Sequence, residues 1–145
     1  MLTYHESRNG RTKMISTKGR YALHVMIDLA ENTDGHYIAL KDVAERQGIS
    51  KKYLEIIVKD LVSNEMIVGT RGKSGGYKLC RDPEDYTVQE ILDATEGPLA
   101  AVACLSKNAV ECPRSADCKT LPMWKEYDEL TRDFFSGKKL SDLVG

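Results

Sequence analysis

Residues 40–64 read LKDVAERQGISKKYLEIIVKDLVSN and contain two amphipathic segments joined by a tight turn. The first segment, residues 40–47, has helical spacing and is followed by Gly48, a residue type common just after a helix. Ser50 is a suitable N-cap for a second helix that runs to about Asn64. The apolar stripe of this second helix consists of Tyr53, Leu54, Ile57, Val58 and Leu61. Two short helices around a glycine-containing turn predict a helix-turn-helix, although an αα-hairpin in another fold has the same local pattern.

The polar residues of the second segment are candidates for contact with DNA. They are Ser50, Lys51, Lys52, Glu55 and Lys59, with Tyr53 beside them in the first turn. The first turn of a recognition helix is where helix-turn-helix proteins reach base edges. A solvated face is the competing interpretation, because Lys51, Glu55 and Lys59 can pair at four-residue spacing. For this helix in isolation, the solvated face is favoured.

The next segment, residues 66–80, changes this balance. It reads MIVGTRGKSGGYKLC and predicts strands over 66–68 and 77–80 around a glycine-rich turn. Arg71 and Lys73 in that turn can grip phosphate or enter a minor groove, and the glycines allow a close backbone approach. The glycines lack the spacing, followed by Lys and then Ser or Thr, that defines a nucleotide-binding P-loop. Because a hairpin directly after a helix-turn-helix is a wing, the chain is predicted to bind double-stranded DNA.

Helices are also predicted on both sides of this unit. Ser16 or Thr17 can cap a helix that ends near Asn32, and its apolar residues recur at helical spacing. Thr87 and Glu90 fit a capping box at the start of another helix. These helices would complete the core of the small domain.

A longer helix is predicted near the C-terminal end, beginning at residues 120–122 with Pro122 in its first turn and closing at Gly137. Its apolar stripe consists of Leu121, Trp124, Tyr127, Leu130 and Phe134 or Phe135. A short amphipathic tail over 140–144 follows. Pairing of the stripe across a twofold axis is favoured over packing on its own domain, because helix-turn-helix proteins commonly read paired half-sites.

The expected fold class is therefore mainly α with a small β wing. Residues 14–98 are assigned to a winged helix-turn-helix DNA-binding domain, 99–119 to a cysteine-containing loop, and 120–145 to a dimerisation helix and tail. Residues 1–13 lack periodicity and are interpreted as a tag or N-terminal extension. No apolar run is long enough to span a membrane and no secretory signal is visible, so a bacterial cytoplasmic protein is expected.

Charge is distributed unevenly along the chain. Residues 1–81 carry 14 Lys+Arg and 9 Asp+Glu, a net charge of +5, whereas residues 82–145 carry 7 and 13, a net charge of −6. The basic half favours a polyanionic partner, although chance clustering alone would give the same asymmetry.

Three of the four cysteines lie close together, at Cys104, Cys112 and Cys118. In the absence of a secretory signal, metal binding or redox chemistry is favoured over a disulfide framework. Thiolates are soft ligands suited to iron–sulfur clusters or zinc, and the helix start after Cys118 favours its thiolate. Cys80, on the return strand of the wing, is expected to be a small packed residue.

Four motifs and the cysteine loop resemble the Rrf2 family of winged-helix repressors. The motifs are STKGRYAL at 16–23, LKDVAERQGISKKYLE at 40–55, RGKSGGYKL at 71–79 and TVQEILDATEG at 87–97. The resemblance covers residues 14 to about 144. It implies a homodimer with crossed C-terminal helices, a recognition helix in each major groove, wings at the minor grooves and a palindromic operator.

The resemblance also assigns roles to individual residues. Ser50, Lys52, Tyr53 and Glu55 match the family's recognition-helix contacts, and Arg71 matches its wing arginine. A carboxylate at Glu55 would be repelled by phosphates unless it accepts a hydrogen bond, for instance from cytosine N4. Lys51, Lys59 and Lys73 would add salt-dependent affinity for the DNA backbone.

In this family loop, Cys104, Cys112 and Cys118 look like the three protein thiolates of an iron–sulfur cluster, [2Fe–2S] or [4Fe–4S]. The fourth ligand departs from the family pattern. One group of relatives has a histidine where this chain has Leu121, and another has an aspartate where this chain has Arg20. Asp117, Glu111, His24 from either subunit and an external thiol are the remaining candidates.

The predicted function is a transcription regulator, mainly a repressor, that senses iron–sulfur, iron or redox status. One alternative is a cluster-free regulator of cysteine or sulfur metabolism, controlled by a thiol switch, zinc, a metabolite or a partner enzyme. A second is a redox or cluster-carrying protein that does not regulate genes. No catalytic constellation is legible, so an enzyme is not expected.

Overall fold

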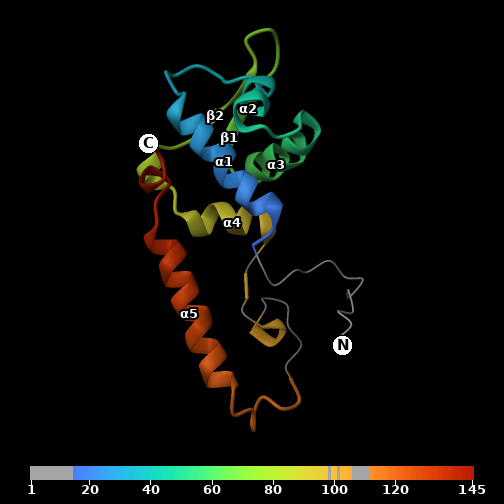
Figure 1. Ribbon diagram of the computed structural model, residues 1–145, viewed down its shortest axis with the longest axis vertical. Coiled ribbons are helices and arrows are strands. Elements are labelled where there is room, and N and C mark those ends of the chain that lie inside the picture. Colours follow the sequence, from blue (N-terminus) through green and yellow to red (C-terminus); the bar gives the residue numbers. More distant parts are fainter. Residues whose placement is uncertain (1–14, 98, 101, 106–111) are drawn as a thin grey trace.

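The computed structural model describes residues 15–97, 99–100, 102–105 and 112–145, and Figure 1 shows their arrangement. The expected extension at residues 1–13 lies outside this described part. The regular elements are α1 (Thr17–Glu31), α2 (Leu40–Gln47), α3 (Lys51–Ser63), β1 (Ile67–Thr70), β2 (Gly76–Leu79), α4 (Val88–Glu96) and α5 (Leu121–Gly137). Short 3₁₀ turns cover Pro83–Asp85, Ala103–Leu105 and Leu140–Asp142. A mainly helical chain with one two-stranded antiparallel sheet confirms the expected fold class.

The predicted helix starts are present in the structure. The Ser16 hydroxyl accepts a hydrogen bond from the Gly19 amide at 3.2 Å, and Ser50 accepts one from the Tyr53 amide at 3.2 Å. Thr87 and Glu90 form the predicted capping box at the start of α4. Each cap satisfies an amide that has no partner inside its helix, so side chains encode these helix starts locally.

Helix α1 lies at the centre of the domain. It packs against α2, α3, α4 and β2, and it buries Ala22, Val25, Met26 and Leu29 almost completely. The α3 side chains that meet this core are Leu54, Ile57, Val58 and Leu61. Because the apolar stripe of α3 is committed to α1, its opposite face is left for solvent or a ligand.

The wing is the β1–β2 hairpin. Its strands pair from Ile67 opposite Leu79 to Thr70 opposite Gly76, so the ladder extends two residues beyond the strand predicted over 66–68. At Gly76, φ is 157° and a Cβ atom would lie 2.1 Å from the carbonyl oxygen of Ile38. Only glycine fits there. Because glycine has no side chain, the backbone of Ile38 can approach β2 and pair with Tyr77 in an isolated antiparallel bridge.

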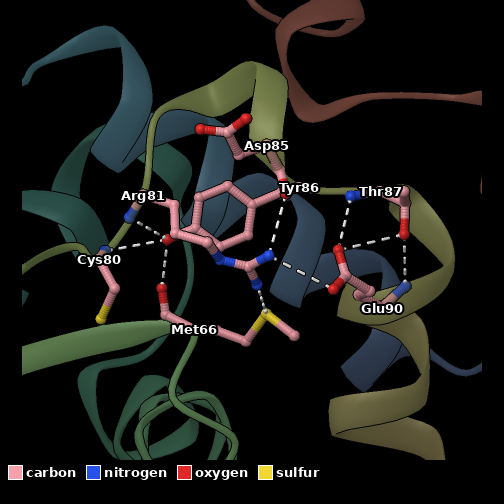
Figure 2. Close-up of polar contacts among 7 residues, drawn as sticks. All are labelled: Met66, Cys80, Arg81, Asp85, Tyr86, Thr87 and Glu90. Carbon is pink, nitrogen blue, oxygen red and sulfur yellow. Dashed lines mark hydrogen bonds and ion pairs between the residues drawn. The ribbon is translucent and has the colours of Figure 1, made fainter.

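Tyr86 joins the base of the wing to the start of α4 (Figure 2). Its ring is fully buried, and its hydroxyl donates to the Met66 carbonyl at 2.6 Å. The same oxygen accepts hydrogen bonds from the amides of Cys80 at 2.9 Å and Arg81 at 3.0 Å. Burial raises the pKa of the Tyr86 phenol, so the phenol keeps the proton that it donates. One hydroxyl therefore ties both ends of the hairpin together.

The segment after α5 returns to the core. Leu140 is fully buried, its amide donates to the Tyr86 carbonyl at 3.0 Å, and the Val88 amide donates to the Lys138 carbonyl at 2.9 Å. Figure 1 shows α5 running back along the molecule to reach this point. The tail that the sequence predicts as one amphipathic turn thus anchors the end of α5 to the winged domain.

Substitution of Tyr86 by Phe should destabilise the fold by about 2 kcal/mol, because it leaves a buried carbonyl and two amides without their partner. Urea denaturation followed by circular dichroism measures the change. Tyr37→Phe is the matched control, since it removes a hydroxyl and keeps the ring that Lys78 Nζ contacts at 4.7 Å from the centroid. Equal stability of the two variants would contradict a structural role for the Tyr86 hydroxyl.

Candidate nucleic-acid interface

The exposed face of α3 carries the residues predicted to contact DNA. Lys51, Lys52, Glu55 and Lys59 are all exposed. Among the described residues, none of these four side chains forms an ion pair. The pairing at four-residue spacing that would stabilise a merely solvated face is therefore not formed, and the four charges remain available to a ligand.

Ser50 and Tyr53 have structural contacts as well. Ser50 is exposed, and its oxygen accepts the capping hydrogen bond, which leaves its hydroxyl proton free to donate outward. Tyr53 is half-buried, with its ring edge-on to Tyr21 at 5.7 Å between centroids. The tyrosine ring is thus held in place by the core while one side of it faces solvent.

The wing presents Arg71 and Lys73 in an exposed turn between β1 and β2. Gly72 between them has φ of 106°, a conformation that suits glycine and lets the turn reverse tightly. Figure 1 shows the wing turn at the same end of the molecule as α2 and α3, away from the start of α5. Two cation-bearing elements therefore lie at one end.

An ion pair between the buried Asp28 and the exposed Arg46 fixes α2 against α1. Asp28 is 1% exposed and accepts hydrogen bonds from Arg46 Nε at 3.0 Å and Arg46 Nη2 at 2.8 Å. Gln47 Nε2 donates to the same carboxylate at 2.9 Å. The hydrogen bonds to Asp28 raise the pKa of Arg46. This bidentate pairing sets the position of α2. It therefore also sets the position of the turn that leads into α3.

The apolar stripe predicted on α5 divides into two faces. Trp124 and Phe135 are half-buried, whereas Tyr127, Leu130 and Phe134 are 56–63% exposed. Met123, which the prediction omitted, joins the exposed group at 52%. The exposed four follow spacings of four, three and four residues, so they form one continuous line along the helix.

The three clustered cysteines are free thiols in the connection between α4 and α5. Cys104 is exposed, and Cys112 and Cys118 are half-buried. In the part of the chain that the structure describes, they are not gathered into a group that could hold a metal ion. Their soft donor chemistry fits an iron–sulfur centre or zinc, whereas their present arrangement does not form one.

Cys118 is the cysteine whose surroundings favour the thiolate. Its pKa is lowered by hydrogen bonds from the Thr120 hydroxyl and amide and from the Leu121 amide, at the start of α5. The sulfur lies 3.5 Å from the Thr120 hydroxyl. Cys80, expected to be packed, is instead exposed, in the bend directly after β2.

The candidate fourth ligands are dispersed. Leu121 is apolar and opens α5, and Arg20 donates a hydrogen bond to Thr17. His24 and Asp117 are both exposed, on α1 and in the loop respectively. Glu111 lies outside the described residues. Within the described part of one chain, no side chain is therefore placed with the cysteines as a fourth ligand.

The end of α4 contacts both α1 and α3. Glu96, its last residue, accepts hydrogen bonds from the Ser16 amide and from the Ser16 hydroxyl at 2.8 Å. Gly19 gives it room, since a Cβ there would lie 2.0 Å from the Glu96 carboxylate. On the other side, the Asn64 amide group at the end of α3 donates to the Ala94 carbonyl at 3.3 Å.

Sequence reasoning did not single out Glu96, Asp28 or Ile56. Ile56 is 49% exposed on α3, although it sits in the apolar run Ile56–Val58. Because Ile56 follows Lys52 by four residues, the two lie on the same face of the helix, and this spacing could have predicted that Ile56 is exposed. Glu96 and Asp28 act through partners distant in the chain, for which a single sequence carries no signal.

Comparisons with known proteins agree with this geometry. The model of the Rrf2 family, described as an iron-dependent transcriptional regulator, matches residues 15–145. The HTH-type transcriptional regulator IscR of Klebsiella pneumoniae is 34% identical over 130 residues, which cover 90% of this chain and 78% of that protein.

Two solved structures extend the likeness. The global cysteine regulator CymR of B. subtilis is 31% identical with a TM-score of 0.73, covering 90% of this chain and 95% of that one. IscR of T. potens is 29% identical with a TM-score of 0.69, covering 90% and 85%. None of the helices that the structure describes is long and apolar enough to cross a membrane. The relatives are named as transcriptional regulators, not as enzymes, and the predicted resemblance is confirmed: this chain belongs to the Rrf2 family of transcriptional regulators.

Proposed function

We propose that this regulator binds a palindromic operator in double-stranded DNA as a homodimer, with α3 in the major groove and the wing at the minor groove. The observation that carries this is the set of five exposed cations on α3 and the wing, at one end of the molecule, without ion pairs to other described residues. They are Lys51, Lys52, Lys59, Arg71 and Lys73. A surface of unpaired cations beside a recognition helix suits a polyanion, and Glu55 among them can accept from cytosine N4.

A second copy of the chain is the proposed partner of α5. The exposed line of Met123, Tyr127, Leu130 and Phe134 is a large apolar surface for a helix in water. In a twofold dimer the same patch meets itself, and the pairing would place two α3 helices for two half-sites. The anchoring of the tail at Leu140 would transmit this pairing to the winged domains.

We further propose that Cys104, Cys112 and Cys118 supply thiolates to an iron–sulfur cluster that controls DNA affinity. Support comes from three free thiols in one loop, the lowered pKa of Cys118 and the iron-dependent description of the family. When bound, the cluster would supply redox and iron sensitivity. The loop would have to draw the cysteines together around it.

The protein's own contacts provide a route from this loop to DNA. The loop follows Glu96, whose carboxylate accepts hydrogen bonds from Ser16, the N-cap residue of α1. Arg132 on α5 donates to the Leu99 carbonyl at 3.2 Å, at the start of the loop. Rearrangement of the loop would therefore move the last turn of α4. That turn contacts α1 through Ser16 and α3 through Asn64.

A cluster-free thiol or zinc switch is the second candidate. It is favoured because the three cysteines do not form a metal-binding group among the described residues, and by the likeness to the global cysteine regulator CymR. In this version, oxidation or zinc binding in the loop would act through the same last turn of α4.

DNA binding predicts a specific salt dependence. Lys52→Ala and Arg71→Ala should each weaken binding to an operator duplex and lower the slope of log affinity against log salt by about one per lost phosphate contact. Fluorescence anisotropy over a range of salt concentrations measures both. The control is Lys125→Ala, which removes one exposed charge from α5. A wild-type protein with no affinity for any duplex would refute the proposal.

Dimerisation through α5 predicts that Leu130→Glu yields a monomer, because a carboxylate would have to be buried in an apolar contact. Sedimentation velocity gives the oligomeric state. Affinity for a duplex with two half-sites should fall at least tenfold. Lys125→Glu, with a new carboxylate on the same helix, should remain dimeric. A dimer that survives Leu130→Glu would show that another surface pairs the chains.

The cysteine proposal predicts visible charge-transfer absorption in protein purified without oxygen, with matching iron and sulfide contents. Cys112→Ala should lose both signals and Cys80→Ala should keep them. A colourless wild type that takes up no cluster on reconstitution would exclude cluster sensing, and zinc content and thiol titration would then test the second candidate.

In either version, Glu96→Ala should keep the cysteine chemistry but lose most of the change in DNA affinity that this chemistry causes. The control variant Asp93→Ala should keep that change.

A further inference from the structure

Ile56 is an apolar side chain on the exposed face of α3. It is 49% exposed, while its helix neighbours Leu54 and Ile57 are fully buried. Lys52 precedes it by four residues and Lys59 follows it by three, so all three lie on one line. That line is opposite the buried stripe that packs on α1.

Single exposed apolar residues are common and need no explanation on most surfaces. Ile56 differs in its position and its neighbours. It lies in the middle of the helix that the proposed function places in the major groove, and both residues flanking it on this line are exposed cations. A β-branched side chain here neither favours the helix nor packs in the core, so folding does not account for it.

We propose that Ile56 is a specificity-determining residue that contacts the 5-methyl group of a thymine in the major groove. This inference rests on the proposed DNA binding. The thymine methyl is the one apolar group on a base edge there, and an aliphatic side chain can exclude water from it. Lys52 and Lys59 would hold the phosphates on either side and so set the depth of the isoleucine.

Glu55 sharpens the expected sequence. It is adjacent to Ile56 on the exposed side of α3, and its carboxylate can accept from cytosine N4. Because both side chains are exposed on one recognition helix, they favour a cytosine and a thymine within each half-site. The cations on this face favour nucleic acid over an apolar protein partner as the ligand of Ile56.

The test begins with selection of preferred duplexes from a randomised library by the wild-type dimer. Each thymine of the selected half-site is then replaced by deoxyuridine, which removes only the methyl group. The variants are Ile56→Ala and Ile56→Gln, and the control is Val62→Gln, another exposed apolar residue near the end of α3. Anisotropy gives the affinities, and sedimentation confirms that each variant has the wild-type oligomeric state.

Uracil at one thymine should weaken wild-type binding about fourfold, the effect expected for one buried methyl group. Ile56→Ala should bind thymine and uracil equally at that position, and Ile56→Gln should select a different base there. Val62→Gln should behave as wild type. The proposal fails if every thymine tolerates uracil in the wild type, or if Ile56→Ala keeps the discrimination. A wild type that binds DNA but selects no sequence would overturn the proposed operator recognition as well.

Discussion

The hydroxyl of Tyr86 is the contact on which the arrangement of the wing depends. Its three hydrogen bonds reach Met66 before the hairpin and Cys80 and Arg81 after it. The backbone carbonyl of the same residue receives the amide of Leu140 from the C-terminal tail. Figure 2 shows the base of the wing and the entry to α4 held together around Tyr86. Because the tail after α5 binds the backbone of the same residue, the relative positions of these three parts are not independent.

Charges are used in two different ways in this domain. Asp28 is buried and fully hydrogen-bonded to Arg46 and Gln47, which makes it a positioning contact between α1 and α2. The cations of α3 and the wing are exposed and without ion pairs among the described residues. A buried carboxylate must be paired to offset its desolvation, whereas an exposed cation costs little and remains free for a ligand.

The last turn of α4 stands between the cysteine loop and the winged end of the molecule. Figure 1 shows the described parts of the loop on the opposite side of α4 from α3. Glu96 reaches α1 through a gap that only glycine leaves at position 19, and Ala94 holds the end of α3. Hydrogen bonds of this kind have alternative partners in water, so the turn is a suitable place for a small rearrangement to change the orientation of α3.

Much of the fold was determined by the sequence itself, because it is encoded locally. Ser16, Ser50 and Thr87 cap their helices with their own side chains, and the period of the apolar residues set which face of α3 is buried. The candidate DNA contacts followed from the same period. The tertiary structure alone decided the burial of Leu140, the partners of Tyr86 and Glu96, the division of the α5 stripe and the separation of the cysteines. These depend on contacts between residues far apart in the chain, and the pattern around one residue carries no information about which distant segment will pack on it.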